Sequence, residues 1–265
     1  MSDLTLDPDA LRHVCPNLSP ESAATIAAGL AQAFQRYKIN TERRAAMAVA
    51  QWAHESDRFK TGTEYASGDA YEGRRDLGNS RPGDGRRFKG RGRIMITGRT
   101  NYTEIAKALG LDCVNHPEML GKSPYSELAS GHWWEAHHCN EFCDRGDFEG
   151  LTRRINGGLN GFDDRKALYA RAREVSAGLV PRDPWSVLMP QEREQMDTLA
   201  KERRIAKRNG GWDKVDPSHK AHAVEAKSWL TERRNRIKHE AGTDPKGWAK
   251  ANRRARYDLL KSATD

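Results

Sequence analysis

The stretch that most constrains how this chain can fold is residues 51–64, which read QWAHESDRFKTGTE. An alanine-rich apolar segment over residues 41–53 leads into it, with the spacing of an amphipathic helix. Glu55 would lie in the last turn of that helix. Glu64 follows beyond a glycine and two threonines, in a segment too polar to continue the helix. Two carboxylates on either side of such a break are the groups that acid/base hydrolysis of a sugar bond requires.

The remainder of the first 182 residues also predicts mainly helices. Helical patterns cover residues 7–14, 20–37, 42–56, 101–109, 126–140 and 163–176. Residues 60–98 instead are rich in Gly, Arg, Asp and Ser with almost no helical period, which is typical of a long functional or disordered loop. Inside that loop, RIMIT at residues 93–97 lies between glycines and predicts a short strand.

A change of composition at PRDP, residues 181–184, predicts a domain boundary. We therefore expect one domain over residues 1–182 and a C-terminal module over residues 183–265. The module holds 19 Lys and Arg against 13 Asp and Glu, a net +6, whereas residues 1–182 hold 26 against 24, a net +2. Three helical segments are expected in it, at residues 191–208, 219–239 and 245–262.

The net charge of +8 predicts attraction to an anionic partner, and charge alone does not choose among nucleic acid, a membrane surface and an acidic wall polymer. No known DNA-reading motif is visible in the basic tail, so we expect no specific nucleic acid as partner. We expect the C-terminal module to make electrostatic contact with an anionic cell envelope, and the protein to be a monomer.

Neither an apolar run of membrane-spanning length nor a secretion signal is visible, which predicts a soluble protein that accumulates in the cytoplasm of the cell that makes it. Four cysteines are too few and too scattered for a disulfide framework. Cys139 and Cys143, with three nearby histidines, could suggest a zinc site, but a second cysteine pair is absent. We expect reduced, structural thiols and neither a metal nor an organic cofactor.

Three ordered motifs carry a resemblance to a known family. They are AQWAHES at residues 50–56, GRGRIMITGRTNY at residues 90–102 and RINGGLNG at residues 154–161, with Arg165 following. In order and approximate spacing they resemble the signature of the family 19 glycoside hydrolases, and most closely its bacteriophage endolysin and lysozyme-like branch. The resemblance covers roughly residues 20–178. It implies a mainly α fold: a two-lobed, lysozyme-like helical domain with minimal strand content, followed by the small helical C-terminal module.

The resemblance also implies roles for particular residues. Glu55 would be the general acid and Glu64 the general base. Thr97 would help to position the attacking water or the substrate. The residues implied to bind substrate or to support the site are Asn101, Tyr102, Asn156, Gly157 and Arg165.

Three features of the proposed site leave alternatives open. The family often has Gln where this chain has Met95, so a hydrogen bond there is missing or replaced. Glu64 is assigned by spacing alone, and Glu72 is its nearest competitor. The two glycines of the INGG motif could also simply permit a turn with positive φ.

These expectations combine into one function: an endolysin that hydrolyses the β-1,4 bonds of peptidoglycan by an inverting mechanism with two carboxylates. Such an enzyme would wait in the host cytoplasm until a membrane pore lets it reach the cell wall. Two alternatives remain. One is a chitinase of the same fold, and the other is a non-catalytic wall-binding or virion protein.

Overall fold

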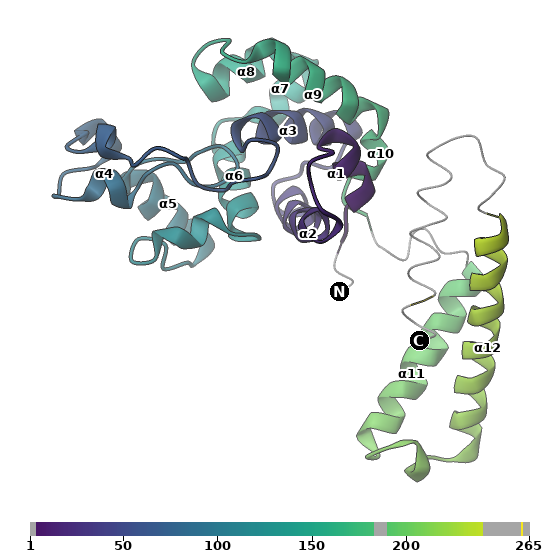
Figure 1. Ribbon diagram of the computed structural model, residues 1–265. Helices are drawn as coiled ribbons and strands as arrows, with labels where there is room; N and C mark the ends of the chain where they lie inside the picture. Colours follow the sequence, from purple (N-terminus) through teal and green to yellow (C-terminus); the bar gives the residue numbers. More distant parts are fainter. Residues whose placement is uncertain (1–3, 183–189, 241–260, 262–265) are drawn as a thin grey trace. The chain divides into compact units, whose positions relative to one another are not determined.

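A computed structural model describes residues 4–182, 190–240 and 261 of the chain (Figure 1). The contacts between residues divide the chain into two compact units. One spans Leu4–Arg182, and the other takes in the chain from Asp183 onward. Each unit is described by itself below.

The first unit is built of helices joined by turns. Its α-helices are α1 (Pro8–Val14), α2 (Pro20–Arg36), α3 (Glu42–Glu55), α4 (Asp84–Arg87), α5 (Arg99–Leu109), α6 (Tyr125–Ala136), α7 (Cys139–Arg145), α8 (Phe148–Asn156), α9 (Phe162–Glu174) and α10 (Ser176–Leu179). Side-chain caps begin α2 and α3, because the Ser19 and Thr41 hydroxyls accept hydrogen bonds from backbone N–H groups of the first turn. The predicted mainly α fold is confirmed.

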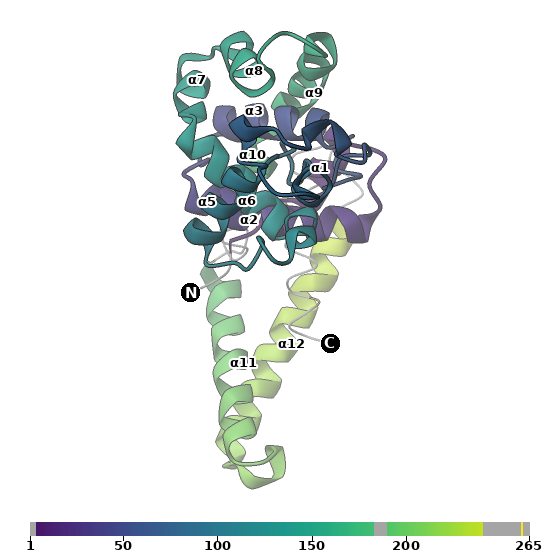
Figure 2. The ribbon, with the colours of Figure 1, turned by 90° about the vertical axis from the view of Figure 1, so that its left-hand side faces the viewer.

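Two apolar clusters divide this unit into a larger and a smaller lobe. The smaller lobe, with α4 and α5, lies on the left of Figure 1 and faces the viewer in Figure 2. In the larger lobe α3 packs against α9, and the buried Trp52 ring of α3 lies 5.9 Å, centroid to centroid, from that of Trp134. The smaller lobe gathers around α5, where the rings of Phe88 and Tyr102 lie 5.1 Å apart. Helix α6 packs against α2 on one side and α5 on the other, so it joins the lobes. The expected two-lobed architecture is therefore present.

The strand predicted over residues 93–97 is not formed. Arg91 and Ile96 instead hydrogen-bond to each other through their backbones, with N···O distances of 3.0 and 2.6 Å, and the residues between them form a tight turn. Gly92 has φ of +82° and Met95 has φ of +54°, and this left-handed backbone reverses the chain where a strand would continue. The β-forming composition of this segment was outweighed by the turn.

The helix predicted over residues 126–140 is also interrupted. It ends at Ala136, and α7 begins at Cys139 after His138 adopts a φ of +54°. The Asn140 side chain accepts a hydrogen bond from the Trp134 indole at 2.9 Å and donates one to the Tyr37 carbonyl at 3.0 Å. These two hydrogen bonds stabilise the break between α6 and α7.

The second unit is a pair of packed helices, α11 (Pro190–Arg208) and α12 (Pro217–Glu240). The turn between them contains Gly210 and Gly211, both with positive φ. Two carboxylates lie in the helix contact: Glu192, paired with Arg233 at 3.0 Å, and Glu202, 2.6 Å from the His219 ring. The helix predicted over residues 245–262 lies outside the described residues except for Lys261. No helix in the described ranges is long and apolar enough to span a membrane.

Candidate active site

Glu55 is the last residue of α3, and a buried arginine holds its carboxylate. The Arg165 guanidinium, on α9, donates to Glu55 Oε1, and only 2% of the Arg165 side chain is exposed against 20% for Glu55. Arg165 Nη1 also donates to the buried Gln51 Oε1, and Gln51 Nε2 in turn donates to Thr152 Oγ1 at 2.8 Å. This chain of bonds fixes the direction in which the Glu55 carboxylate points.

The three residues after Ser56 share an unusual backbone. Asp57, Arg58 and Phe59 have φ of +48°, +56° and +62°, although none is glycine. Such left-handed conformations cost roughly 1–2 kcal/mol per residue. The turn is held by a 2.6 Å bond from Arg58 N to the Ala53 carbonyl and by burial of Phe59. It turns the chain back sharply at the end of α3, so that Glu55 stands at a helix terminus.

His54 braces this turn against α9. Its Nδ1 lies 2.7 Å from Asp164 Oδ2, and Arg58 Nη2 donates to the other oxygen of Asp164 at 2.6 Å. Gly161 makes room for the ring: its φ is +69°, and a Cβ there would lie 2.2 Å from His54 Cε1. The His54 imidazole therefore has a structural role, because it holds the turn against α9.

Glu64 belongs to the smaller lobe, and two neutral donors hold its carboxylate. Oε1 accepts from the Gly90 backbone N–H at 2.6 Å, and Oε2 accepts from the Tyr71 hydroxyl at 3.0 Å. Burial, followed by the bond to Glu64, raises the pKa of the Tyr71 phenol, so at neutral pH the hydroxyl keeps its proton and donates. The Glu64 carboxylate is therefore oriented without a charged partner.

Glu72, the competitor for the second acidic role, is engaged elsewhere. Its two carboxylate oxygens accept from the backbone N–H groups of Gly83 and Gly85, each at 2.8 Å. Glu72 therefore closes the loop that leads into α4. This contact favours Glu64 as the second acidic residue of the site.

Thr97 lies beside Tyr71, Asn101 bonds to Thr97, and the Tyr102 side chain is buried. The side chain of Thr97 lowers the pKa of the Tyr71 phenol, so it lies beside the hydroxyl that contacts Glu64. Asn101 Nδ2 donates to the Thr97 carbonyl at 2.7 Å. Tyr102, predicted to bind substrate, is completely buried, and its hydroxyl donates to the Lys89 carbonyl at 2.7 Å. Its ring belongs to the core of the smaller lobe, and its role in substrate binding stays a prediction.

The INGG motif begins on a helix, and its Asn156 is the last residue of α8. Asn156 Nδ2 is buried and has no hydrogen-bond partner among the described residues, and its contact with substrate stays a prediction. Gly157 is exposed and ends α8 with a φ of +71°. Arg165 is only 1% exposed and contacts Glu55, an arrangement that suits the supporting role implied for it, and any contact with substrate stays a prediction.

Sequence reasoning missed two tyrosines next to the second carboxylate. Tyr71 contacts Glu64 directly, as described above. Tyr65 is 77% exposed, and its hydroxyl donates to Asp57 Oδ2 at 3.1 Å, which ties the Glu64 segment to the turn behind Glu55. Both lie in a glycine-rich loop without periodicity. An aromatic residue in a loop that is otherwise small and polar was the only available signal.

The four cysteines offer no reactive group. All are free and buried, and burial raises the pKa of Cys15 and of Cys139 to about 12. These thiols therefore remain protonated at neutral pH. Across residues 4–182 and 190–240, no three His, Cys, Asp or Glu side chains converge on a point where a metal ion could bind.

These features define a class: a two-lobed helical unit with a carboxylate on each lobe, as in hydrolases of glycosidic bonds. Solved structures share this fold. Chitinase C from Streptomyces griseus aligns over 67% of this chain and 78% of its own, with a TM-score of 0.52 and 20% identity. A bacterial family 19 chitinase aligns over 64% of this chain and 94% of its own, with a TM-score of 0.51 and 20% identity.

Sequence relatives point to the same family. A glycosyl hydrolase family 19 domain-containing protein of Haemophilus influenzae is 39% identical over 99 residues, which are 37% of this chain and 48% of that protein. An endochitinase of Arabidopsis thaliana is 36% identical over 129 residues, 48% of this chain and 44% of its own length. The chain therefore spans about half the length of these curated relatives. No protein-family profile matches it. The chain is thus similar in sequence to parts of family 19 proteins and shares its fold with family 19 chitinases.

Proposed function

We propose that the first unit hydrolyses the β-1,4 glycosidic bonds of bacterial peptidoglycan, and that the protein is an endolysin of the lysozyme type. The observation that carries the proposal is that each lobe holds one carboxylate in a fixed direction. Arg165 holds Glu55 at the end of α3, whereas the Gly90 N–H and the Tyr71 hydroxyl hold Glu64. Inverting hydrolysis of a glycosidic bond uses two carboxyl groups, one as general acid and one as general base.

In the proposed reaction Glu55 gives its proton to the leaving glycosidic oxygen as the bond from that oxygen to the anomeric carbon breaks. Arg165 stabilises the Glu55 carboxylate that remains. Glu64 accepts a proton from a water molecule, whose oxygen forms the new bond to the anomeric carbon from the opposite face. The Thr97 hydroxyl helps to position this water, and Asn156 Nδ2 binds the sugar. Both proton transfers use side chains alone, so the mechanism requires neither metal nor organic cofactor.

The biological setting is part of the proposal. The enzyme would collect in the host cytoplasm during phage growth and reach the wall when a membrane pore opens. There the basic C-terminal unit would hold it on the anionic envelope by charge. We propose that the enzyme acts as a monomer, with peptidoglycan glycan strands as its partner.

A chitinase activity is the second candidate, because several relatives carry that name. Chitin and peptidoglycan share N-acetylglucosamine, so a site for one polymer fits much of the other. The rates of reducing-end release from colloidal chitin and from purified peptidoglycan decide between them. A higher rate on chitin would overturn the peptidoglycan assignment.

The catalytic assignment is tested with Glu55→Gln and Glu64→Gln on purified peptidoglycan. Each should lower the rate of reducing-end release about 10²- to 10⁴-fold, since each removes one proton transfer. Glu118→Gln, at an exposed glutamate on the 3-10 helix η3 (Pro117–Gly121), is the matched control and should retain full activity. NMR of the first product should show the inverted anomer. If both catalytic variants still lysed cells, a non-catalytic wall-binding or virion role would replace this proposal.

A further inference from the structure

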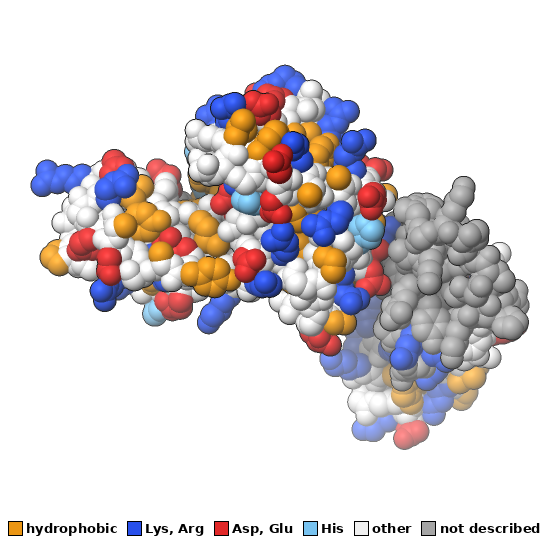
Figure 3. Space-filling model, turned by 45° about the horizontal axis from the view of Figure 1, so that its top comes forward, with side chains coloured by type: hydrophobic (Ala, Val, Ile, Leu, Met, Phe, Trp, Pro, Cys, Tyr) orange, Lys and Arg blue, Asp and Glu red, His pale blue; other side chains and the backbone are white. Residues whose placement is uncertain are grey.

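The smaller lobe concentrates positive charge that the rest of the first unit lacks. Residues 71–99 hold nine Lys and Arg against three Asp and Glu, a net +6. The net charge of residues 1–182 is only +2, so residues 1–70 and 100–182 together carry a net charge of −4. Lys and Arg side chains extend from the lobe of α4 and α5, on the left of Figure 3. The charge of the chain is thus divided between this lobe and the C-terminal unit.

Ion pairs neutralise some of these arginines but not all. Arg74 pairs with Asp76, and Arg93 pairs with the buried Glu127 at 2.7 Å. Arg87 differs from them, because its Nε and Nη2 donate only to backbone carbonyls, those of Val114 and Asn115, at 2.9–3.2 Å. Carbonyl oxygens fix a guanidinium in place without cancelling its charge. Arg87 therefore presents a positioned and uncompensated positive charge.

A groove of about 420 Å³ brings Arg87 together with two more arginines. Its lining residues are Arg81, Pro82, Gly83, Asp84, Arg87, Arg99, Val114 and Asn115. Arg99 is held by the buried Asp84 and lies over the Phe88 ring, 4.5 Å from its centroid. Arg81 uses its backbone N–H to bond Asp84 at 3.0 Å, and no described carboxylate pairs with its side chain. Three guanidiniums thus line the groove with a single carboxylate to offset them.

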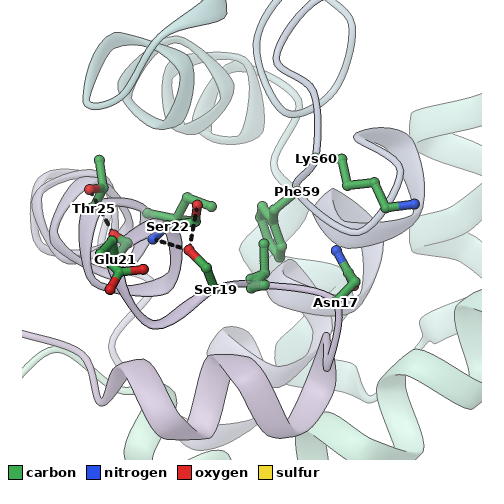
Figure 4. A pocket seen from close by; sticks show the side chains of 9 residues that line it. Asn17, Ser19, Glu21, Ser22, Thr25, Phe59 and Lys60 are labelled. Carbon is green, nitrogen blue, oxygen red and sulfur yellow. Dashed lines mark hydrogen bonds between the residues drawn. The ribbon is translucent and has the colours of Figure 1, made fainter.

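A second groove of the same unit shows that this charge is not a general property of its surface. It measures about 460 Å³ and lies between the start of α2 and the turn at Phe59 and Lys60 (Figure 4). Its charged lining residues are Glu21 and Lys60, and Lys60 lies 3.5 Å from Asp57. That groove has no excess of positive charge, so it serves as an internal reference for the arginine groove.

We infer that the arginine groove binds oxyanions, carboxylate or phosphate, carried by the cell-wall polymer that the enzyme cleaves. The planar fork of a guanidinium matches the paired oxygens of both groups. Peptidoglycan supplies carboxylates on its stem peptides, and its attached polymers supply phosphodiesters, whereas chitin is neutral. The inference rests on the proposed function and deepens it, because the groove would select an anionic glycan over a neutral one.

The test measures binding of the full chain to purified sacculi by co-sedimentation, in a Glu55→Gln background that prevents digestion. Arg81→Glu is the principal variant, because the Arg81 side chain has no described partner to lose. At about 50 mM salt it should lower affinity about 3- to 10-fold, and at about 500 mM salt the difference should vanish through screening. Arg87→Gln should act in the same direction. Arg145→Glu, at a 58% exposed arginine of α7, is the matched control and should change affinity less than twofold.

Three further substrates identify the anion. Treatment with hydrofluoric acid removes phosphodiester polymers from sacculi, and an amidase removes the stem peptides. If the Arg81→Glu effect disappears after the first treatment the ligand is phosphate, and if it disappears after the second it is carboxylate. Chitin should bind wild type and Arg81→Glu equally. Equal affinity of the two proteins for untreated sacculi, or an equal loss on chitin, would overturn the inference. The proposed function fails separately, if the active protein releases no reducing ends from sacculi.

Discussion

The two carboxylates of the site are held in opposite ways. Glu55 stands on a helix, and its partner is a buried arginine that is itself fixed by Gln51. Glu64 stands on a loop and is oriented by a backbone N–H and a tyrosine hydroxyl. A helix fixes the direction of a side chain by its period, so one charged contact completes the arrangement. A loop has no period, and neighbouring segments must supply every constraint.

Replacing Arg165, the cation beside Glu55, is expected to have the largest effect on stability. Arg165→Met leaves the Glu55 carboxylate and Gln51 Oε1 without their donor in a largely buried place. The free energy of unfolding should fall by about 2–4 kcal/mol, less than for a fully buried pair because Glu55 is partly exposed. Urea denaturation measures this fall. Arg165→Met combined with Glu55→Gln should lose less than the sum of the single variants. Additive losses would show that the pair is not energetically coupled.

Acid should loosen the Glu64 lobe through Asp84. The hydrogen bond from Arg99 lowers the pKa of the buried Asp84, so the folded state holds this proton less tightly than the unfolded state does. The stabilisation is therefore complete above the unfolded pKa of about 3.9 and is lost as pH falls through the lower folded value. Asp84→Asn should destabilise by about 1–3 kcal/mol at neutral pH. The difference from wild type should shrink below about pH 4.

Asp163→Asn provides the control for this pH dependence. Asp163 also has a lowered pKa, through Lys166, but its side chain is 96% exposed. Its replacement should leave the unfolding free energy unchanged at every pH. If the difference in unfolding free energy between Asp84→Asn and wild type persisted at low pH, Asp84 would stabilise the fold through packing and not through its ionisation.

The smallest effect is expected from the tyrosine that holds Glu64. Tyr71→Phe removes one neutral hydrogen bond to the carboxylate, and the Gly90 N–H remains. The kcat should fall about 5- to 10-fold, equivalent to about 1 kcal/mol, with little change in KM. Tyr169→Phe, at a ring stacked on Phe148, is the matched control and should retain kcat. A change confined to KM would show that Tyr71 contacts substrate instead of positioning Glu64.

Much of the fold could be read from the chain. The apolar period of residues 42–56 predicted α3, and Ser19 and Thr41, which cap α2 and α3, are residue types that favour that position. One further feature of the site could have been predicted from the sequence but was overlooked. Gln51 lies four residues before Glu55, hence on the same face of α3, which is the spacing of two groups that share one partner.

Other features could not be predicted from local sequence patterns. The turn at residues 92–95 has the composition of a strand. Met95 adopts a left-handed conformation, which methionine rarely does, so its residue type did not predict a turn. Burial of Tyr102 depends on a core assembled from residues as far apart in the chain as Phe88 and Ala129. Likewise, Gly90 lies 26 residues from Glu64, and no local pattern could pair them.

The sequence by itself determined the helices, the position of Glu55 at a helix end and the excess of positive charge. These follow from periodicity and composition, which act over a few residues. Only the tertiary structure decided which carboxylate would stand beside a cation, which tyrosine would hold Glu64 and which arginines would share a groove. Those outcomes depend on contacts between residues far apart in the chain, where packing and unsatisfied hydrogen bonds select the partners.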